Sequence, residues 1–189
     1  MKALFMLLGL PLLFTGCAAT VRSTVDGYGE SPLSRADPLY FDREALPLAE
    51  RPVSDSCRDA AKALGLTVED ALCPACRRVE VRARLAGTTQ AIRSGPTFGT
   101  SFGLLGGASG FGVGLGTGNT RSEEQAERVI EVGIFERGAK NLLRTITTRS
   151  IGRENSVPAV AYEMCIAAFR EYPQNLKGKE YSVKTGAKE

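Results

Sequence analysis

The chain has 189 residues, and its 24 Lys and Arg against 21 Asp and Glu give a net charge of +3. It contains no His, which excludes hydrolase triads built on imidazole and every His-ligated metal site. The nearly balanced charge gives no reason to expect a nucleic-acid partner, and no motif indicates a bound cofactor.

The first residues have the pattern of an export signal. Lys2 supplies a positive charge, and residues 3–14 are mostly apolar, in a stretch too short for a bilayer span, which takes about 20 residues. Cys17 directly follows Gly16, and this arrangement resembles a bacterial lipobox, in which the peptide is cut before an acylated Cys. We therefore predict residues 1–16 as a signal peptide and Cys17 as the lipidated residue. The alternative is an ordinary secretory signal followed by a structural Cys.

A lipidated Cys17 would hold the protein on a membrane, because several acyl chains together bind a bilayer far more firmly than one chain. Ala18, rather than Asp, follows this Cys. By resemblance to the sorting signals of Gram-negative bacteria, Ala18 favours the outer membrane, with the protein on its periplasmic face. The predicted partners are therefore the membrane, through the anchor, and another protein of the envelope.

Two strands and a helix are predicted in the first part of the mature chain. Thr20–Tyr28 alternates loosely between apolar and polar residues, and Leu39–Phe41 is a short aromatic run. A helix is expected over Cys57–Leu64, with Ser54 or the Asp after it as the N-terminal cap. Gly65 stands where a left-handed C-terminal cap is expected.

A strand is then predicted over Val79–Leu85, where apolar and polar residues alternate strictly. The segment Gly95–Gly118 follows, with ten glycines in 24 residues. Its context disfavours a phosphate-cradling loop, because no Lys-Ser or Lys-Thr pair follows the glycines. We favour a flexible loop because glycine has great backbone freedom. The regular alternation of glycine in its second half favours a strand instead, with one face that another backbone can approach.

This glycine-rich segment is the predicted interaction element, with the rest of the domain as its scaffold, because functional surfaces are often carried on loops over a rigid frame. It has more apolar residues than a plain linker. The binding candidates are Phe98, Phe102, Phe111, Val113 and Leu115. The alternative is that these residues simply pack on the sheet.

The last part of the chain predicts a hairpin and a second helix. Arg128–Phe135 and Leu142–Ser150 are the two strands of the hairpin. Ser156 caps the helix, which carries an apolar stripe and ends at Pro173. Residues 176–189 are expected to form a flexible basic tail.

Together these elements predict an α+β fold, with an antiparallel sheet of about five strands, two helices on one face and a glycine-rich insertion. Residues 17–175 would form a single periplasmic domain. This length is sufficient to bury a core without a metal ion.

The cysteines after the anchor are even in number, which in an exported chain is typical of disulfides. Cys73 and Cys76 can close on each other, which leaves Cys57 and Cys165 to join the two helices. The Cys-x-x-Cys spacing also looks like a thioredoxin-type redox motif, but that motif needs a helix beginning at it, and a strand is predicted here. Free thiols and a four-Cys zinc site are the remaining alternatives.

The order of these elements resembles a known family. A lipobox precedes Thr24–Tyr28, then come a helix, an alternating strand, a glycine run, a hairpin and a helix that closes on Phe169–Pro173. This arrangement resembles the bacterial lipoproteins grouped as domain of unknown function 4136. The resemblance implies a periplasm-facing α+β domain and supplies no activity and no catalytic residues.

From these observations we expect a lipid-anchored protein of the bacterial envelope that has no catalytic activity and serves as a binding or assembly accessory. One alternative is a periplasmic thiol-redox enzyme that uses Cys73 and Cys76. Another is a purely structural envelope protein.

Overall fold

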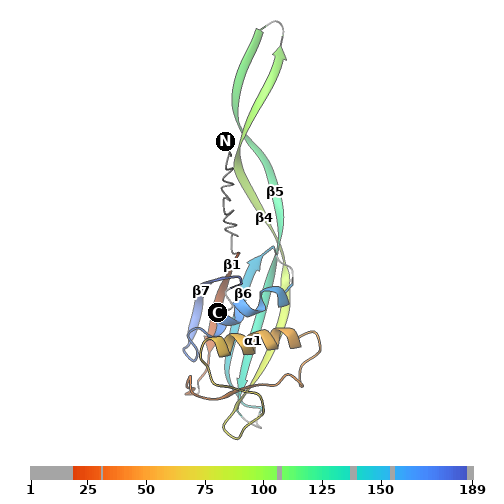
Figure 1. Ribbon diagram of the computed structural model, residues 1–189. Helices are drawn as coiled ribbons and strands as arrows, with labels where there is room; N and C mark the ends of the chain where they lie inside the picture. The colour runs from red at the N-terminus through yellow and green to blue at the C-terminus, as the bar shows by residue number, and fades with distance from the viewer. Residues whose placement is uncertain (1–18, 31, 106–107, 137–139, 154–155, 187–189) are drawn as a thin grey trace, which may run out of the picture.

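The computed structural model describes residues 19–30, 32–105, 108–136, 140–153 and 156–186, and between residues 88 and 124 it describes the backbone. A seven-stranded sheet has the order β3-β2-β4-β5-β6-β1-β7, and two helices cover one of its faces (Figure 1). The elements are β1 (Thr20–Tyr28), β2 (Leu39–Phe41), α1 (Arg51–Ala63), β3 (Val68–Glu69), β4 (Arg77–Leu105), β5 (Ala108–Phe135), β6 (Leu142–Gly152), the 3-10 helix η1 (Pro158–Val160), α2 (Ala161–Phe169) and β7 (Leu176–Lys184).

The α+β class with two helices is confirmed, but the sheet has seven strands rather than about five and is mixed rather than wholly antiparallel. β2 runs parallel to both of its neighbours, β3 and β4, whereas the other neighbouring strands are antiparallel. In the chain, α1 lies between β2 and β3. A helical crossover of this kind returns the chain in its original direction, so the strands on either side of it pair in parallel.

Alternate residues of the two central strands form the core under the helices. Val79 and Val81 of β4 and Ile130, Val132 and Ile134 of β5 have no exposed surface. The helices contribute buried residues that are mostly small or flexible, namely Cys57, Ala60, Ala61, Met164, Cys165, Ala168 and Phe169. Because small side chains allow backbones to approach closely, α1 and α2 can pack against each other and against the sheet.

The first helix begins earlier than its predicted cap. α1 starts at Arg51, and Ser54 is a buried residue of its first turns rather than its cap. Pro52 lies in the first turn, where its fixed φ suits a helix and its missing N–H is not needed. At the other end Gly65 has a φ of +72°, which confirms the predicted left-handed residue after the helix.

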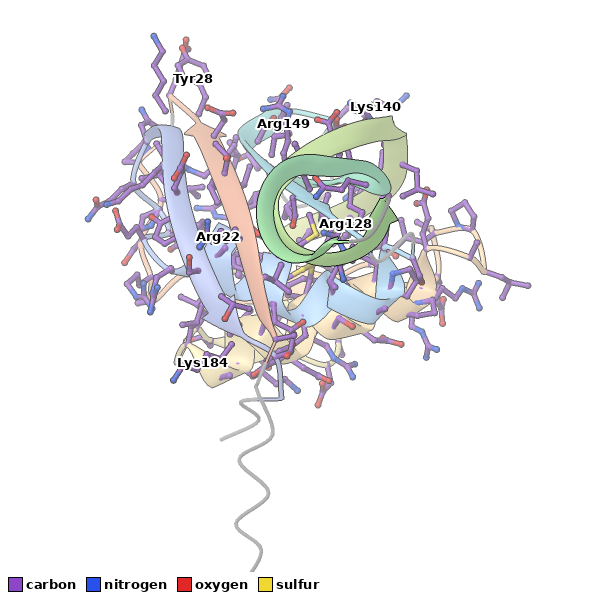
Figure 2. The ribbon with its side chains drawn as sticks, turned by 90° about the horizontal axis from the view of Figure 1, so that it is seen from above. Arg22, Tyr28, Arg128, Lys140, Arg149 and Lys184 are labelled. Atoms are coloured by element: carbon purple, nitrogen blue, oxygen red, sulfur yellow. A yellow bond between two sulfur atoms is a disulfide. The ribbon has the colours of Figure 1, made fainter. Side chains whose placement is uncertain are left out.

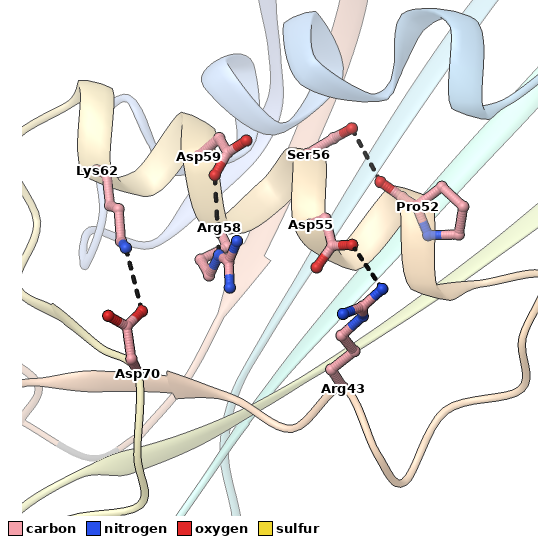
Figure 3. A network of polar contacts seen from close by, with 8 residues as sticks. All are labelled: Arg43, Pro52, Asp55, Ser56, Arg58, Asp59, Lys62 and Asp70. Atoms are coloured by element: carbon pink, nitrogen blue, oxygen red, sulfur yellow. Dashed lines mark hydrogen bonds and ion pairs between the residues drawn. The ribbon is translucent and has the colours of Figure 1, made fainter.

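The solvent side of α1 carries exposed polar contacts (Figure 3). Arg43 pairs with Asp55 at 3.4 Å, and Lys62 pairs with Asp70 at 3.3 Å. The Ser56 hydroxyl donates to the carbonyl of residue 52 at 2.9 Å. Exposed pairs of this kind each contribute little to stability, so the buried side of α1 holds it in place.

The segment predicted as a flexible basic tail forms an edge strand as far as Lys184. β7 pairs antiparallel with β1, with Val21 opposite Val183 and Ser23 opposite Tyr181. Tyr181 is buried, and the Lys residues of the strand are exposed. Pairing with β7 satisfies the backbone N–H and C=O groups of β1 that would otherwise form a bare sheet edge. These hydrogen bonds outweigh the weak strand pattern in the sequence of β7.

Candidate functional site

The glycine-rich segment, which we expected to be a loop, is the outer half of a long two-stranded hairpin. β4 and β5 pair from Arg78 opposite Phe135 to Leu105 opposite Ala108, with irregularities after Leu85 and after Arg93. The prediction of a loop is therefore wrong. The strands begin inside the sheet, and each residue added to an existing antiparallel ladder gains backbone hydrogen bonds, which extends the pairing through the glycines.

The hairpin projects well beyond the sheet (Figure 1). β6 pairs with β5 only as far as Ala126, and β2 pairs with β4 only at residues 77–79. Beyond these points, among the residues that the structure describes, β4 and β5 pair only with each other. A two-stranded ribbon on its own is marginally stable in water, and this outer half has no third described strand to support it.

The register places the predicted binding candidates opposite one another. Phe98 lies opposite Leu115, Phe102 lies opposite Phe111, and Val113 lies opposite Thr100. Because successive strand residues alternate between faces, all five candidates occupy positions on one face of the ribbon. The intervening positions on the other face are mostly glycine. The alternation of glycine with larger residues, which favoured a strand in the sequence, therefore places glycine on one face of the ribbon and apolar residue types on the other.

A buried arginine, which was not among the site residues predicted from the sequence, lies where the hairpin leaves the sheet. Arg128 is only 3 % exposed, and its Nη2 donates to Ser150 Oγ at 3.1 Å. That hydroxyl donates in turn to the Arg22 carbonyl at 2.7 Å, which ties β5, β6 and β1 together. A Cβ at Gly152 would meet Arg128 Nη2 at 2.6 Å, so the glycine leaves room for the guanidinium.

Figure 2, which looks down along the hairpin, shows Arg128 beneath its outline. The sequence did carry a signal for this residue. Arg128 falls at an inward position of the same alternation as Ile130 and Val132, where a charged residue is unusual. Its hydrogen bond to Ser150 links the base of the hairpin to β6.

The face of the sheet opposite the helices is polar at this end. Arg22, Glu127, Arg149 and Glu180 line a shallow hollow there, and Arg149 Nη1 lies 2.8 Å from a carboxylate oxygen of Asp26. The hollow is open to water, and exposed charges are well solvated there.

The opposite end of the covered face holds a second buried arginine. Arg144 is 5 % exposed, and its Nη1 donates to the Gln174 carbonyl at 3.0 Å. Burial lowers the pKa of Arg144. Burial also raises the pKa of the nearby Tyr172 to about 12, so this tyrosine stays neutral over the physiological range. Both residues lie in the domain, at the end of the sheet away from the hairpin.

Both predicted disulfides are confirmed. Cys57 of α1 and Cys165 of α2 are joined, with their Cα atoms 5.0 Å apart, and Cys73 is joined to Cys76. The Cys73–Cys76 turn leads directly into β4 at Arg77, not into a helix, and Cys76 is buried. The predicted lipidation residue, Cys17, lies outside the described residues.

Two further properties concern metal ions and helices. Among the described residues, no group of three or more His, Cys, Asp or Glu side chains could hold a metal ion. Within the same part of the chain, no helix is long and apolar enough to cross a membrane.

No protein-family model matches the sequence, and no curated protein matches it. The similarity to the domain of unknown function 4136 lipoproteins therefore stays a prediction. Among solved structures, the PelC dodecamer from Paraburkholderia phytofirmans aligns with 77 % of this chain and 94 % of its own, at 11 % identity and a TM-score of 0.42. A PDZ domain protein from Parabacteroides distasonis aligns with 86 % of this chain and 38 % of its own, at 11 % identity and a TM-score of 0.47. Likenesses this distant carry no argument about function.

Proposed function

We propose that this protein is a lipid-anchored accessory of the bacterial envelope, without catalytic activity, whose long hairpin is its binding or assembly element. The anchor would be Cys17, and the protein would lie on the periplasmic face of the outer membrane. The observation that carries the proposal is the outer half of the hairpin. It is a ribbon with apolar residue types on one face and, among the described residues, no other strand paired to it.

The rest of the molecule supports the role of a scaffold. The Cys57–Cys165 disulfide joins the two helices, and the Arg128–Ser150 hydrogen bond fixes the base of the hairpin. A rigid base is useful to a projecting binding element because it limits the ordering entropy lost on binding. The redox alternative has less support, since the Cys73–Cys76 turn does not begin a helix that would activate a thiolate.

Deleting Gly95–Gly118 tests the binding role. After this deletion the ladder would end at Arg93 opposite Arg121. Ser94, Asn119 and Thr120 would then form a three-residue connection between the strands. We expect the shortened protein to be exported and to unfold cooperatively at the temperature of the full chain, but to lose its partners in a pull-down from cross-linked envelopes. Unchanged partner recovery would eliminate the proposed binding role.

Fatty-acid labelling tests the anchor separately. The wild-type chain should incorporate labelled palmitate, and Cys17→Ser should abolish the label and reduce the recovery with outer membranes on a density gradient. Absence of label in the wild-type chain would refute the anchor. Recovery of the wild-type chain with inner membranes would refute the outer-membrane location.

A further inference from the structure

The outer half of the hairpin has the charge and length of a membrane-spanning segment. From Ser94 to Thr120 the sequence has no Lys, Arg, Asp or Glu, and this section starts where Arg93 lies opposite Arg121. The ladder then runs from the Pro96 pair to the Leu105 pair, about ten residues in each strand. Strands of about 9–11 residues cross the hydrocarbon core of a bilayer when tilted. We call residues 94–105 and 108–120 the charge-free section.

The two faces of the charge-free section differ in residue type. At successive pairs along one face, Phe98 lies opposite Leu115, Thr100 opposite Val113 and Phe102 opposite Phe111. The alternate positions on the other face carry Gly, Ser and Thr, with only Leu105 and Ala108 as the apolar pair nearest the tip. This dyad alternation of apolar and small or polar residues is the signature of strands with lipid on one side and a polar interior on the other.

The position of the hairpin agrees with the proposed anchor. Thr20, the third residue after Cys17, starts β1, and its partner in β7 is Lys184. The pairing of β1 with β6 and of β6 with β5 puts the start of β1 at the same end of the sheet as Ala126, where the hairpin leaves. The acyl chains and the hairpin would therefore meet the membrane from the same end of the domain. A polar section from Gly87 to Arg93, about 20 Å long at the usual strand rise, would cross the headgroup region.

We propose that the charge-free section inserts into a lipid bilayer, where several copies of the chain pair edge to edge and close into a ring of hairpins. This inference rests on the proposed function, because it names the surface that the hairpin binds. A single hairpin would leave the outer N–H and C=O groups of both strands without partners in hydrocarbon, which is very unfavourable. Edge pairing with further copies satisfies those groups. The apolar face then contacts acyl chains, and the glycine-rich face lines the polar interior of the ring.

Two neighbouring residues provide a matched test of the two faces. Thr100 belongs to the apolar face and Ser101 to the glycine-rich face, at the same depth of the same strand. Thr100→Lys would put a charge against lipid, whereas Ser101→Lys would put the same charge inside the ring. Both variants and the wild type are purified as full-length lipidated chains and mixed with vesicles of phosphatidylethanolamine and phosphatidylglycerol. Hydrogen exchange of peptides from residues 94–120 then reports insertion.

In the wild type, vesicles should slow exchange in the charge-free section, and chemical cross-linking should give discrete oligomers. Thr100→Lys should reduce the inserted population about 30- to 1,000-fold, as expected for a lysine facing lipid at mid-depth. Ser101→Lys should keep the protection and the oligomers. Equal effects of both variants, vesicles without effect on wild-type exchange, or cross-linking that yields only monomer would each overturn the inference.

The outcomes separate this inference from the proposed function. If vesicles leave the exchange unchanged but deletion of Gly95–Gly118 still removes envelope partners, the hairpin binds a protein and the membrane inference is wrong. If the deletion leaves all partners in place while vesicles protect the wild-type section, the hairpin is a membrane element and the proposed role in protein binding is wrong.

Discussion

The inner and outer halves of β4 and β5 share one ladder but have different surroundings. The inner half has β6 beside β5 and, at residues 77–79, β2 beside β4, and helices cover one of its faces. Val81 and Val132 in this half have no exposed surface. The outer half, from Gly95 to Gly118, continues the same pairing with, in the described part of the chain, no third strand beside it. An existing ladder is therefore sufficient to extend strand pairing, whereas stability depends on burial of apolar side chains.

The transition between the two halves is abrupt. Leu85, the last residue of the alternating run in β4, is 53 % exposed, and the register shifts between Leu85 and Gly87. Directly opposite Leu85 is Arg128, which is buried and bonded to Ser150. The core therefore ends at this level, and the hairpin continues from a base fixed by polar contacts.

Removing the disulfide between the helices should have the largest effect on the inner region. Cys57→Ala combined with Cys165→Ala opens a link across 108 residues and should lower the free energy of unfolding by about 4–5 kcal/mol in the chain-entropy model. Thermal and urea unfolding measure this loss. The matched control, Cys73→Ala with Cys76→Ala, should lose only about 1–2 kcal/mol because its loop is short. Equal losses from the two pairs would contradict the assignment.

A pair of truncations on the same strand compares the two halves directly. Ile130→Ala removes a fully buried side chain and should destabilise the domain by about 2–5 kcal/mol. Leu115→Ala, in the charge-free section, should change the free energy of unfolding in lipid-free solution by less than about 0.5 kcal/mol. Urea denaturation of both variants provides the measurement. A large loss from Leu115→Ala would show that the outer half packs on the domain instead.

High pH should weaken the domain through Tyr172. Burial raises its pKa to about 12, above the ordinary value of 10.0, so the folded state holds the proton more tightly than the unfolded state. The resulting stability is present below pH 10 and is lost as the pH rises through 12, with a total of about 2–3 kcal/mol. Urea unfolding between pH 9 and about 12 should show the fall, and Tyr172→Phe should reduce it. The chain that lacks Gly95–Gly118 should show the same fall, because Tyr172 lies in the domain.

The smallest effect is expected on the solvent side of α1. The Lys62 and Asp70 side chains are 44 % and 81 % exposed, so Lys62→Ala should cost less than about 0.5 kcal/mol, and less still at high salt. Thermal unfolding at low and high ionic strength measures this. A loss comparable with that of Ile130→Ala would mean that surface charge pairs, not the core, hold the helix.

Some features of this protein were determined by the sequence alone, because their causes are local. Several features depend only on neighbouring residues and were predicted at their positions. They are the alternation of β1, the alternation of the inner half of β4, the short aromatic β2 and the left-handed Gly65. The two disulfides were predicted as one of three possible pairings, because the Cys-x-x-Cys spacing lets Cys73 close on Cys76 and leaves Cys57 for Cys165. The five binding candidates were chosen from their apolar type, and their alternation with glycine is visible in the sequence.

Other features were decided only by tertiary structure, because their partners lie far away in the chain. In Leu176–Lys184 only Tyr181 and Val183 alternate with polar residues in the manner of a strand, and pairing with the edge of β1 makes the whole segment one. The parallel direction of β2 depends on the path of α1, and the inward place of Arg128 depends on Ser150 and Gly152. The glycine-rich segment is extended because the core fixes the register of β4 against β5. Glycine has no strand preference of its own, so only that long-range register could decide its conformation.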